Sequence, residues 1–305
     1  MQRRNFLESA ATFLLIAGAG AAFAPTVVAG ASPKGDKAGG GDALGDRLAK
    51  LEQRSGGRLG VAVLDTADGR HWATRGDERF AMCSTYKLPL VAAVLRKAEL
   101  GEIDLDARIA VPQAALVGNS PATAPIARAG GSASVARLCE ASMTVSDNTA
   151  ANLLLPLVGD PAGVNRFLHG IGDDVSRMQR VPGAPLRGGD ANDTTTPNAM
   201  LATLRRVLLG DALNPASRQR LTEWMLASKT GETRLRAGLP AHWRIGHKTG
   251  TGQGTANDVA IVWPGRRKPV LIASYLTDAW GDDELRNTVL ADVARSLAAH
   301  WIAAA

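Results

Sequence analysis

The sequence predicts an α+β protein, in which an antiparallel sheet flanked by helices is built from both ends of the chain and an all-helical domain is inserted between its strands. Extended patterns lie toward the two ends of the chain, at 59–82 and 243–276. Helical periodicity dominates the residues between them. The predicted boundaries are therefore 42–82 plus 228–305 for the sheet domain and 83–227 for the helical domain.

The N-terminus has the pattern of an export signal rather than of a folded segment. Arg3-Arg4 precedes an apolar stretch from Ala10 to Phe23, as in twin-arginine signals, and Ala22-Phe23-Ala24 offers a cleavage site. We expect a signal peptide over 1–24, with Val27-Val28-Ala29 as the second candidate for cleavage, and a flexible linker over 25–41. An uncleaved membrane anchor is disfavoured because the apolar stretch is short and rich in Gly and Ala. The protein is then periplasmic or secreted, and meets a membrane only during export.

The amino-acid composition limits the kinds of partner and cofactor that we expect for this protein. The chain has 305 residues, 45% of them apolar and 21% charged, which is ordinary for a globular protein. The net charge is +6, but the basic residues are scattered, so we expect no nucleic-acid partner. No His and Cys cluster has metal-ligand spacing, so neither a metal nor an organic cofactor is expected, and we expect a monomer. Whether Cys83 and Cys139 form a disulfide or are buried as small apolar side chains stays open.

The N-terminal part of the predicted sheet follows an outer helix that begins at Asp42 and ends at Gly56-Gly57. Strands over 59–64 and 70–75 form a hairpin, with Asp68-Gly69 as its turn signal. A short extended piece over 79–82 then leads into an apolar helix over 84–100.

The middle of the chain carries several helical segments, most of them with a capping side chain or Pro at the start. They span 134–142, 148–158, 160–169, 196–209 and 214–227. Extended patterns resume at 243–249, 258–263 and 270–276, and a last amphipathic helix runs over 282–304. Because the strands come from both ends, the start of the 84–100 helix lies where the two predicted domains meet, and such clefts commonly bind small ligands.

Three short motifs carry candidate chemistry. Ser84 and Lys87 lie one helical turn apart, so a lysine of lowered pKa could take the proton of the serine hydroxyl. Ser146-Asp147-Asn148 lies on a loop between two helices, where a plain helix cap is the simpler alternative. Lys-Thr-Gly occurs twice: at 229–231, where its Gly is most simply a helix stop, and at 248–250, where it continues a strand.

In this order the motifs make up the signature of serine β-lactamases and penicillin-binding proteins, and the sequence resembles class A β-lactamases over nearly all of its exported part. Further matching stretches are 119–123, 146–155, 193–197 and 248–252. The resemblance implies the β-lactamase and D,D-peptidase-like fold and a β-lactam substrate.

The resemblance also implies roles for single residues. Ser84 would be the acylated nucleophile, Lys87 would take part in its proton transfer, and Ser146 would relay a proton to the leaving nitrogen. Asn148 would hold the side-chain amide of the substrate, and Lys248 would supply positive charge near the leaving nitrogen and near the substrate carboxylate. Thr249 would also be a substrate-binding residue. The backbone N–H groups of Ser84 and Thr251 would bind the carbonyl oxygen. Arg234 would lie behind the carboxylate subsite, or would be an ordinary surface arginine.

Two positions depart from the family. The family carries a glutamate, as general base for deacylation, in the loop before Asp193-Thr194-Thr195. The loop over 180–193 has none here, although Arg180 and Asp193 match the ion pair that closes it, and Asp190 is the one carboxylate strictly inside it. Family members that bridge the cysteine before the nucleophile pair it with one at the position of Gly252, so Cys83 lacks that partner.

The leading hypothesis is thus a serine hydrolase that opens β-lactam rings through an acyl-enzyme on Ser84. A D,D-peptidase acting on D-Ala-D-Ala termini is the alternative within enzymes. A protein that is acylated once and serves as a β-lactam trap or sensor is the alternative of another class. The missing glutamate separates them, because a substitute base favours turnover and the lack of one favours the trap.

Overall fold

A five-stranded antiparallel sheet forms the centre of the computed structural model, which describes residues 41–180 and 192–302. Its strand order is β2-β1-β9-β8-β7. The strands span Arg58–Asp65 (β1), His71–Thr74 (β2), Arg244–Gly252 (β7), Thr255–Trp263 (β8) and Val270–Thr277 (β9). The pairing of β1 with β9, with Val61 opposite Ser274, joins the two ends of the chain as predicted.

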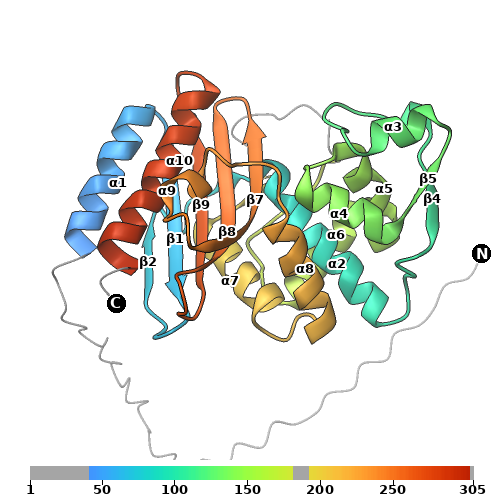
Figure 1. Cartoon of the computed structure of the whole chain (residues 1–305), viewed down its shortest axis with the longest axis horizontal. Coiled ribbons are helices and arrows are strands. Elements are labelled where there is room, and N and C mark those ends of the chain that lie inside the picture. Colours follow the sequence, from blue (N-terminus) through green and yellow to red (C-terminus); the bar gives the residue numbers. More distant parts are fainter. Residues whose placement is uncertain (1–40, 181–191, 303–305) are drawn as a thin grey trace, which may run out of the picture. The chain divides into compact units, whose positions relative to one another are not determined.

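Each face of the sheet is covered by helices, and side-chain alternation along the strands divides the core accordingly. Val61 and Val63 pack with α1 (Gly41–Ser55) and α10 (Asp283–Leu297) in one apolar cluster, whereas Ala62 belongs to the other. Figure 1 shows α1 and α10 side by side on the sheet, and α7 (Pro197–Leu208) contacts the opposite face.

The helical region is organised around α2, which spans Lys87–Glu99. Every residue of α2 from Lys87 to Leu95 is buried, because this helix is apolar on all sides and other helices surround it. The helices in contact with it are α4 (Val135–Thr144), α5 (Asn148–Val158), α6 (Asp160–Gly170) and α8 (Pro215–Leu226). Two helices that the sequence did not predict, α3 (Thr123–Arg128) and α9 (Leu235–Gly238), are short.

The inserted region is not purely helical, which corrects the prediction. Inside it, β4 (Arg108–Ala110) pairs with β5 (Ser132–Ser134). A third strand of this region, β6 (Thr194–Thr195), pairs with β3 (Phe80–Ala81), which precedes the region. Pairings of two or three residues are too short to leave a periodic pattern in the sequence. The described residues belong to one compact unit, and the division into domains at 83 and 228 stays a prediction.

Two predicted element ends also shift. The helix predicted from residue 84 begins instead with a 3₁₀ turn over Cys83–Tyr86, and α2 starts at Lys87. The last helix continues from Leu297 as a π-helical turn over Ala298–Ile302. The predicted signal peptide, the linker over 25–41 except for its last residue, and Asp190 lie outside the described residues, among which no helix is long and apolar enough to cross a membrane.

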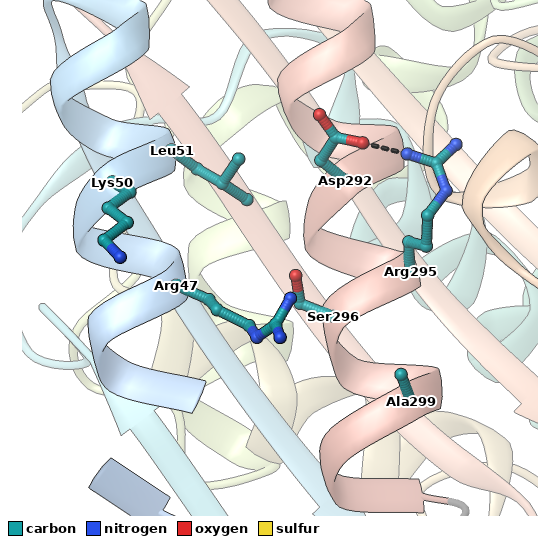
Figure 2. A pocket seen from close by; sticks show the side chains of 7 residues that line it. All are labelled: Arg47, Lys50, Leu51, Asp292, Arg295, Ser296 and Ala299. Atoms are coloured by element: carbon teal, nitrogen blue, oxygen red, sulfur yellow. Dashed lines mark hydrogen bonds and ion pairs between the residues drawn. The ribbon is translucent and has the colours of Figure 1, made fainter. Parts of the chain in front are cut away.

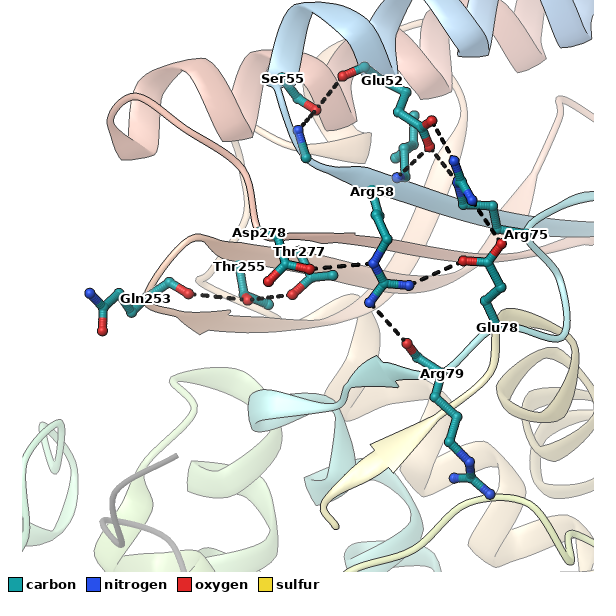
Figure 3. Close-up of polar contacts among 12 residues, drawn as sticks. Glu52, Ser55, Arg58, Arg75, Glu78, Arg79, Gln253, Thr255, Thr277 and Asp278 are labelled. Atoms are coloured by element: carbon teal, nitrogen blue, oxygen red, sulfur yellow. Dashed lines mark hydrogen bonds and ion pairs between the residues drawn. The ribbon is translucent and has the colours of Figure 1, made fainter. Parts of the chain in front are cut away.

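An ion-pair network ties α1 to the edge of the sheet (Figure 3). Glu52 of α1 accepts hydrogen bonds from Arg75 Nε at 2.7 Å and from the backbone N–H of Leu59 at 2.9 Å. The bond from Arg75, with help from Leu59 and against the effect of burial, lowers the pKa of Glu52. Arg58 extends the network to Glu78 and Asp278. The network fixes α1 across the start of β1.

A cavity of about 300 Å³ opens between α1 and α10. Arg47 and Lys50 line it from α1, and Asp292 and Ser296 line it from α10. Figure 2 shows the Arg47 side chain reaching across toward Ser296. None of the residues that line this cavity belongs to the three motifs.

Packing against the sheet allows a stability test with two glycines. A Cβ at Gly60 would lie 2.4 Å from a ring carbon of the buried Phe80, so Gly60→Ala should lower the free energy of unfolding by about 1 to 3 kcal/mol. A Cβ at Gly45, in α1, would meet nothing within 4 Å, so Gly45→Ala should raise it by about 0.5 to 1 kcal/mol. Urea unfolding followed by circular dichroism measures both. Parent-like stability of the Gly60→Ala variant would contradict the packing described.

Candidate active site

Ser84 lies in the 3₁₀ turn that leads into α2, and the chain before it is anchored to the sheet. Asn257 of β8 donates hydrogen bonds from Nδ2 to the carbonyl oxygens of Ala81 at 2.8 Å and Met82 at 3.1 Å. Cys83 is held at φ +45°, in the left-handed region. Strain of this kind persists only where neighbouring contacts impose it, and here it sets the position of the Ser84 side chain.

Lys87 connects the motifs. Its Nζ lies 3.2 Å from Ser84 Oγ and 3.2 Å from Ser146 Oγ. It also donates to the carbonyl oxygen of Ser146 at 2.7 Å and to Asn148 Oδ1 at 2.6 Å. The last two atoms can only accept. When Lys87 is a neutral amine, its two N–H groups can satisfy them, which leaves its lone pair for a hydroxyl of Ser84 or Ser146.

The environment of Lys87 favours that neutral form. Its side chain is completely buried, and burial lowers the pKa of Lys87 to about 7, an effect that the nearby carboxylate of Asp147 partly offsets. A substantial fraction of the Lys87 side chains is therefore uncharged at neutral pH. The structure gives the lysine the property that a general base next to a serine hydroxyl requires.

The loop over 146–148 is held by Asp147. This buried carboxylate caps α5 through the backbone N–H of Ala150 at 2.8 Å. It also accepts from the backbone N–H groups of Ala122 and Thr123, at 2.9 Å each, and from the Thr123 hydroxyl. The helix-cap interpretation of this motif is thus correct for Asp147. Because Asp147 makes the cap, Ser146, at φ +55°, and Asn148 are free to face Lys87.

Lys248 reaches Ser146 from the opposite side. It projects from β7, and its Nζ donates to Ser146 Oγ at 3.0 Å. Lys248 is also completely buried, and burial, reinforced by the positive charge of Lys87, lowers its pKa. The Ser146 hydroxyl therefore bridges two lysines whose mutual repulsion favours the loss of a proton.

Arg234 is buried, which excludes the interpretation as a surface arginine. It is 7% exposed and donates from Nη1 to the carbonyl oxygens of Gly250 at 2.8 Å and Asn257 at 2.9 Å. Its Nη2 donates to Thr251 Oγ1 at 2.7 Å. The guanidinium thus lies against β7, beside the threonines that follow Lys248.

A pocket of about 330 Å³ brings the predicted residues together. Its lining includes Ser84, Ser146, Asn148, Arg234, Thr249 and Thr251. Lys87 and Lys248 are buried behind this lining, in contact with Ser146. No group of three or more His, Cys, Asp or Glu side chains within 41–180 and 192–302 is placed to hold a metal ion.

The first Lys-Thr-Gly does not end a helix, which corrects that interpretation. The α8 helix ends at Leu226, and Gly231, at φ +82°, packs on the Thr249 side chain. Lys229 is exposed, but Thr230 lines the pocket and its Oγ1 lies 2.8 Å from Thr249 Oγ1. The sequence predicts no role for Thr230, because nothing near it in the chain shows that it contacts the second Lys-Thr-Gly.

Asn119 also lines the pocket without a predicted role. It donates from Nδ2 to the Ser146 carbonyl oxygen at 2.9 Å, and the motif match at 119–123 was the available signal. Both cysteines are free, Cys139 being buried and Cys83 partly buried. Burial raises the pKa of the Cys83 thiol to about 11, against a small opposing effect of Arg234, so this thiol stays protonated beside Ser84.

Comparison with known proteins assigns the family. A family model described as "Beta-lactamase enzyme family" matches residues 43–301. The chain is 46% identical to Beta-lactamase L2 of Stenotrophomonas maltophilia, over 81% of this chain and 82% of that protein. It is 42% identical to Beta-lactamase OXY-1 of Klebsiella oxytoca, over 83% of this chain and 88% of that protein.

Comparison with solved structures leads to the same family. An ancestral class A β-lactamase, GNCA, superposes with a TM-score of 0.81 and 55% identity over 83% of this chain and 98% of that one. A β-lactamase from Xanthomonas campestris gives a TM-score of 0.82 and 48% identity over 85% of this chain and 97% of that one. Fold and sequence thus define a serine hydrolase of the β-lactamase type. The chain belongs to the class A β-lactamases, enzymes that hydrolyse β-lactams.

The four hydrogen bonds of Asp147 lead to a stability prediction. An Asn side chain has one acceptor oxygen in place of two, so Asp147→Asn leaves buried donors unpaired and should lower the free energy of unfolding by about 2 to 4 kcal/mol. Asp282→Asn is the matched control, because Asp282 caps α10 through one hydrogen bond, to the backbone N–H of Leu285. That change should matter by less than about 0.5 kcal/mol, since Asn is an equally good cap. Equal losses in urea unfolding would contradict the role given to Asp147.

Proposed function

We propose that Ser84 is the residue acylated by the β-lactam and that Lys87 is the base that activates it. The neutral Lys87 amine takes the proton of Ser84 Oγ as that oxygen attacks the lactam carbonyl carbon. The observation that carries this proposal is the Lys87 Nζ, 3.2 Å from Ser84 Oγ, on a buried side chain whose pKa is lowered to about 7.

Ser146 completes proton transfer in this proposal. When the lactam C–N bond breaks, the leaving nitrogen takes the Ser146 hydroxyl proton, and the Lys87 ammonium returns a proton to Ser146 Oγ at 3.2 Å. Lys248 assists because its charge, 3.0 Å from the same oxygen, favours the proton's departure. The carbonyl oxygen is held by the backbone N–H groups of Ser84 and Thr251, each worth roughly 3 to 4 kcal/mol in the transition state.

The remaining pocket residues bind the substrate. Lys248, Thr249 and Arg234 provide the positive, hydrogen-bonding wall for the substrate carboxylate, and Asn148 holds the side-chain amide. Support for the carboxylate wall comes from Thr251 Oγ1, which accepts from Arg234 and can in turn donate to an anion.

We further propose that acylation outruns deacylation. The loop over 180–193 holds no glutamate, while its closing ion pair is present, with Arg180 Nε 2.5 Å from Asp193 Oδ2. The residues proposed for acylation all lie outside this loop. An enzyme that releases its acyl group slowly behaves much like a β-lactam trap or sensor. Only the composition of the loop over 180–193 favours that alternative.

We also propose that the signal peptide over 1–24 exports the protein by the twin-arginine route. The support is the Arg3-Arg4 pair ahead of the apolar stretch from Ala10 to Phe23. The mature chain is proposed to divide into the sheet domain and the helical domain at residues 83 and 228. A monomer is proposed for the exported protein, and its mass by light scattering would test this.

Two-step kinetics give the main functional prediction. A positioned base for deacylation contributes about 10² to 10⁴ in rate, so its absence predicts a burst of about one equivalent of β-lactam per protein followed by slow turnover. Mass spectrometry at steady state should show a penicilloyl adduct on Ser84, and Ser84→Ala should abolish it. Linear turnover from the first seconds without an adduct would contradict this prediction.

Asp190→Asn tests whether the one carboxylate inside the loop substitutes for the missing base. A further large fall of the slow phase would identify Asp190 as the substitute. An unchanged slow phase would leave Lys87 or bulk water as the acceptor of the proton. In both cases the burst should keep its size, because Asp190 takes no part in acylation.

The two Lys-Thr-Gly motifs provide a matched pair of variants. Lys248→Ala should reduce the second-order rate constant for acylation by carboxylate-bearing β-lactams by about tenfold to a hundredfold, since hydrogen bonds to charged groups contribute about 1.5 to 3 kcal/mol. Lys229→Ala should leave it unchanged, because that side chain is exposed. Stopped-flow measurements compare the two, and equal losses would overturn the choice of Lys248.

A further inference from the structure

A buried pair of ionisable residues lies on the same face of the sheet as Thr249 and Thr251 and takes no part in the chemistry above. His247 precedes Lys248 on β7, so its side chain shares a face with Thr249 and Thr251. Its Nδ1 lies 3.1 Å from both carboxylate oxygens of Asp258, on β8. The His247 side chain is 3% exposed and that of Asp258 is 0% exposed.

Asp258 connects this pair to Arg234. One carboxylate oxygen of Asp258 accepts from the backbone N–H of Leu235 at 3.3 Å, directly after Arg234 in the chain. The imidazole supports the other end of this segment, because a Cβ at Gly231 would lie 3.1 Å from His247 Cε1. His247 and Asp258 thus lie beneath the segment 231–235, whose guanidinium contacts Thr251.

The charges around the imidazole favour its protonated form. Burial and the neighbouring Lys248 lower the pKa of His247, but the attraction of Asp258, its hydrogen bond and the charge of Glu232 outweigh them and raise it. Asp258 also attracts the charge of Arg234. A protonated His247 balances Asp258. As pH rises through the elevated pKa of His247 that balance is lost, and the uncompensated Asp258 weakens the positive potential that Arg234 presents to an anion.

We propose that His247 is a positioning residue for the substrate-carboxylate subsite: through Asp258 it holds the segment that carries Arg234, and its protonated form strengthens the binding of the carboxylate. This inference rests on the proposed role of Arg234 and Lys248 in binding that carboxylate. It predicts that the preference for anionic β-lactams is greatest at low pH and falls as pH rises.

The test compares a penicillin that has a free carboxylate with its methyl ester. The second-order rate constant of acylation is measured for both by stopped flow between about pH 5.5 and about pH 9, where the penicillin carboxylate stays ionised. The ratio of the two rate constants cancels the titration of Lys87, which acts on both substrates. In the parent protein this ratio should fall by about threefold to tenfold across the titration of His247.

His247→Asn keeps an N–H donor near the position of Nδ1 but cannot titrate, so its ratio should vary less with pH than the parent's. Any pH dependence of the ratio that remains in this variant is due to the titration of Lys248. His242→Asn is the control, because His242 is exposed, and it should follow the parent. A parent ratio independent of pH, or the same fall in His247→Asn as in the parent, overturns the inference. Should His247→Asn fail to fold, His247→Gln, which also cannot titrate, takes its place, and a parent ratio independent of pH still overturns the inference.

The acyl adduct separates this inference from the function on which it rests. Absence of both a penicilloyl adduct on Ser84 and turnover of the β-lactam in the parent would overturn the proposed function itself. An adduct that forms with a flat ratio would overturn only the role of His247.

Discussion

Two lysine side chains buried around one hydroxyl are the constraint on which the site depends. Lys87 and Lys248 are both completely buried and both lie within 3.2 Å of Ser146 Oγ. Buried like charges are tolerated only when acceptors surround them or when one loses its proton. The fold does both, since carbonyl and amide oxygens surround Lys87 and its pKa falls to about 7. In the function that we propose, the reactivity of Ser84 is thus a consequence of burial.

Holding the acceptors in place requires a strained backbone. Cys83, Asn119 and Ser146 all have φ between +45° and +59°, a region that residues other than Gly rarely occupy. All three are next to or part of the pocket lining. Buried polar contacts offset the strain, above all those of Asp147 and of Asn257. The strained residues and the anchoring residues therefore form one unit, in which the contacts of the anchoring residues hold the strained backbone in place.

The sequence predicted the long elements well because their ends carry local signals. The helices after Ser134, Asp147, Thr196 and Asn214 begin where those caps lie, and each cap accepts a backbone hydrogen bond in the structure. The motif residues also meet as predicted, since their order identified the family. What the sequence could not give was contact between distant segments. The burial of Arg234 depends on carbonyl groups of β7 and β8, and the place of Thr230 depends on Thr249.

Contacts between distant segments also fix the two ends of the loop over 180–193. Its closing residue Asp193 accepts from the backbone N–H of Met82 through its carbonyl oxygen, at 2.8 Å, and its carboxylate accepts from Gln179 and Arg180. The pairing of β6 with β3 continues this attachment. The ends of the loop are therefore fixed to the strand that precedes Ser84, whatever residues lie between them. Because Lys87, Ser146 and Lys248 come from α2, the 146–148 loop and β7, the acylation that we propose uses no residue of 181–191, and under this proposal a change of sequence there affects only the release of the acyl group.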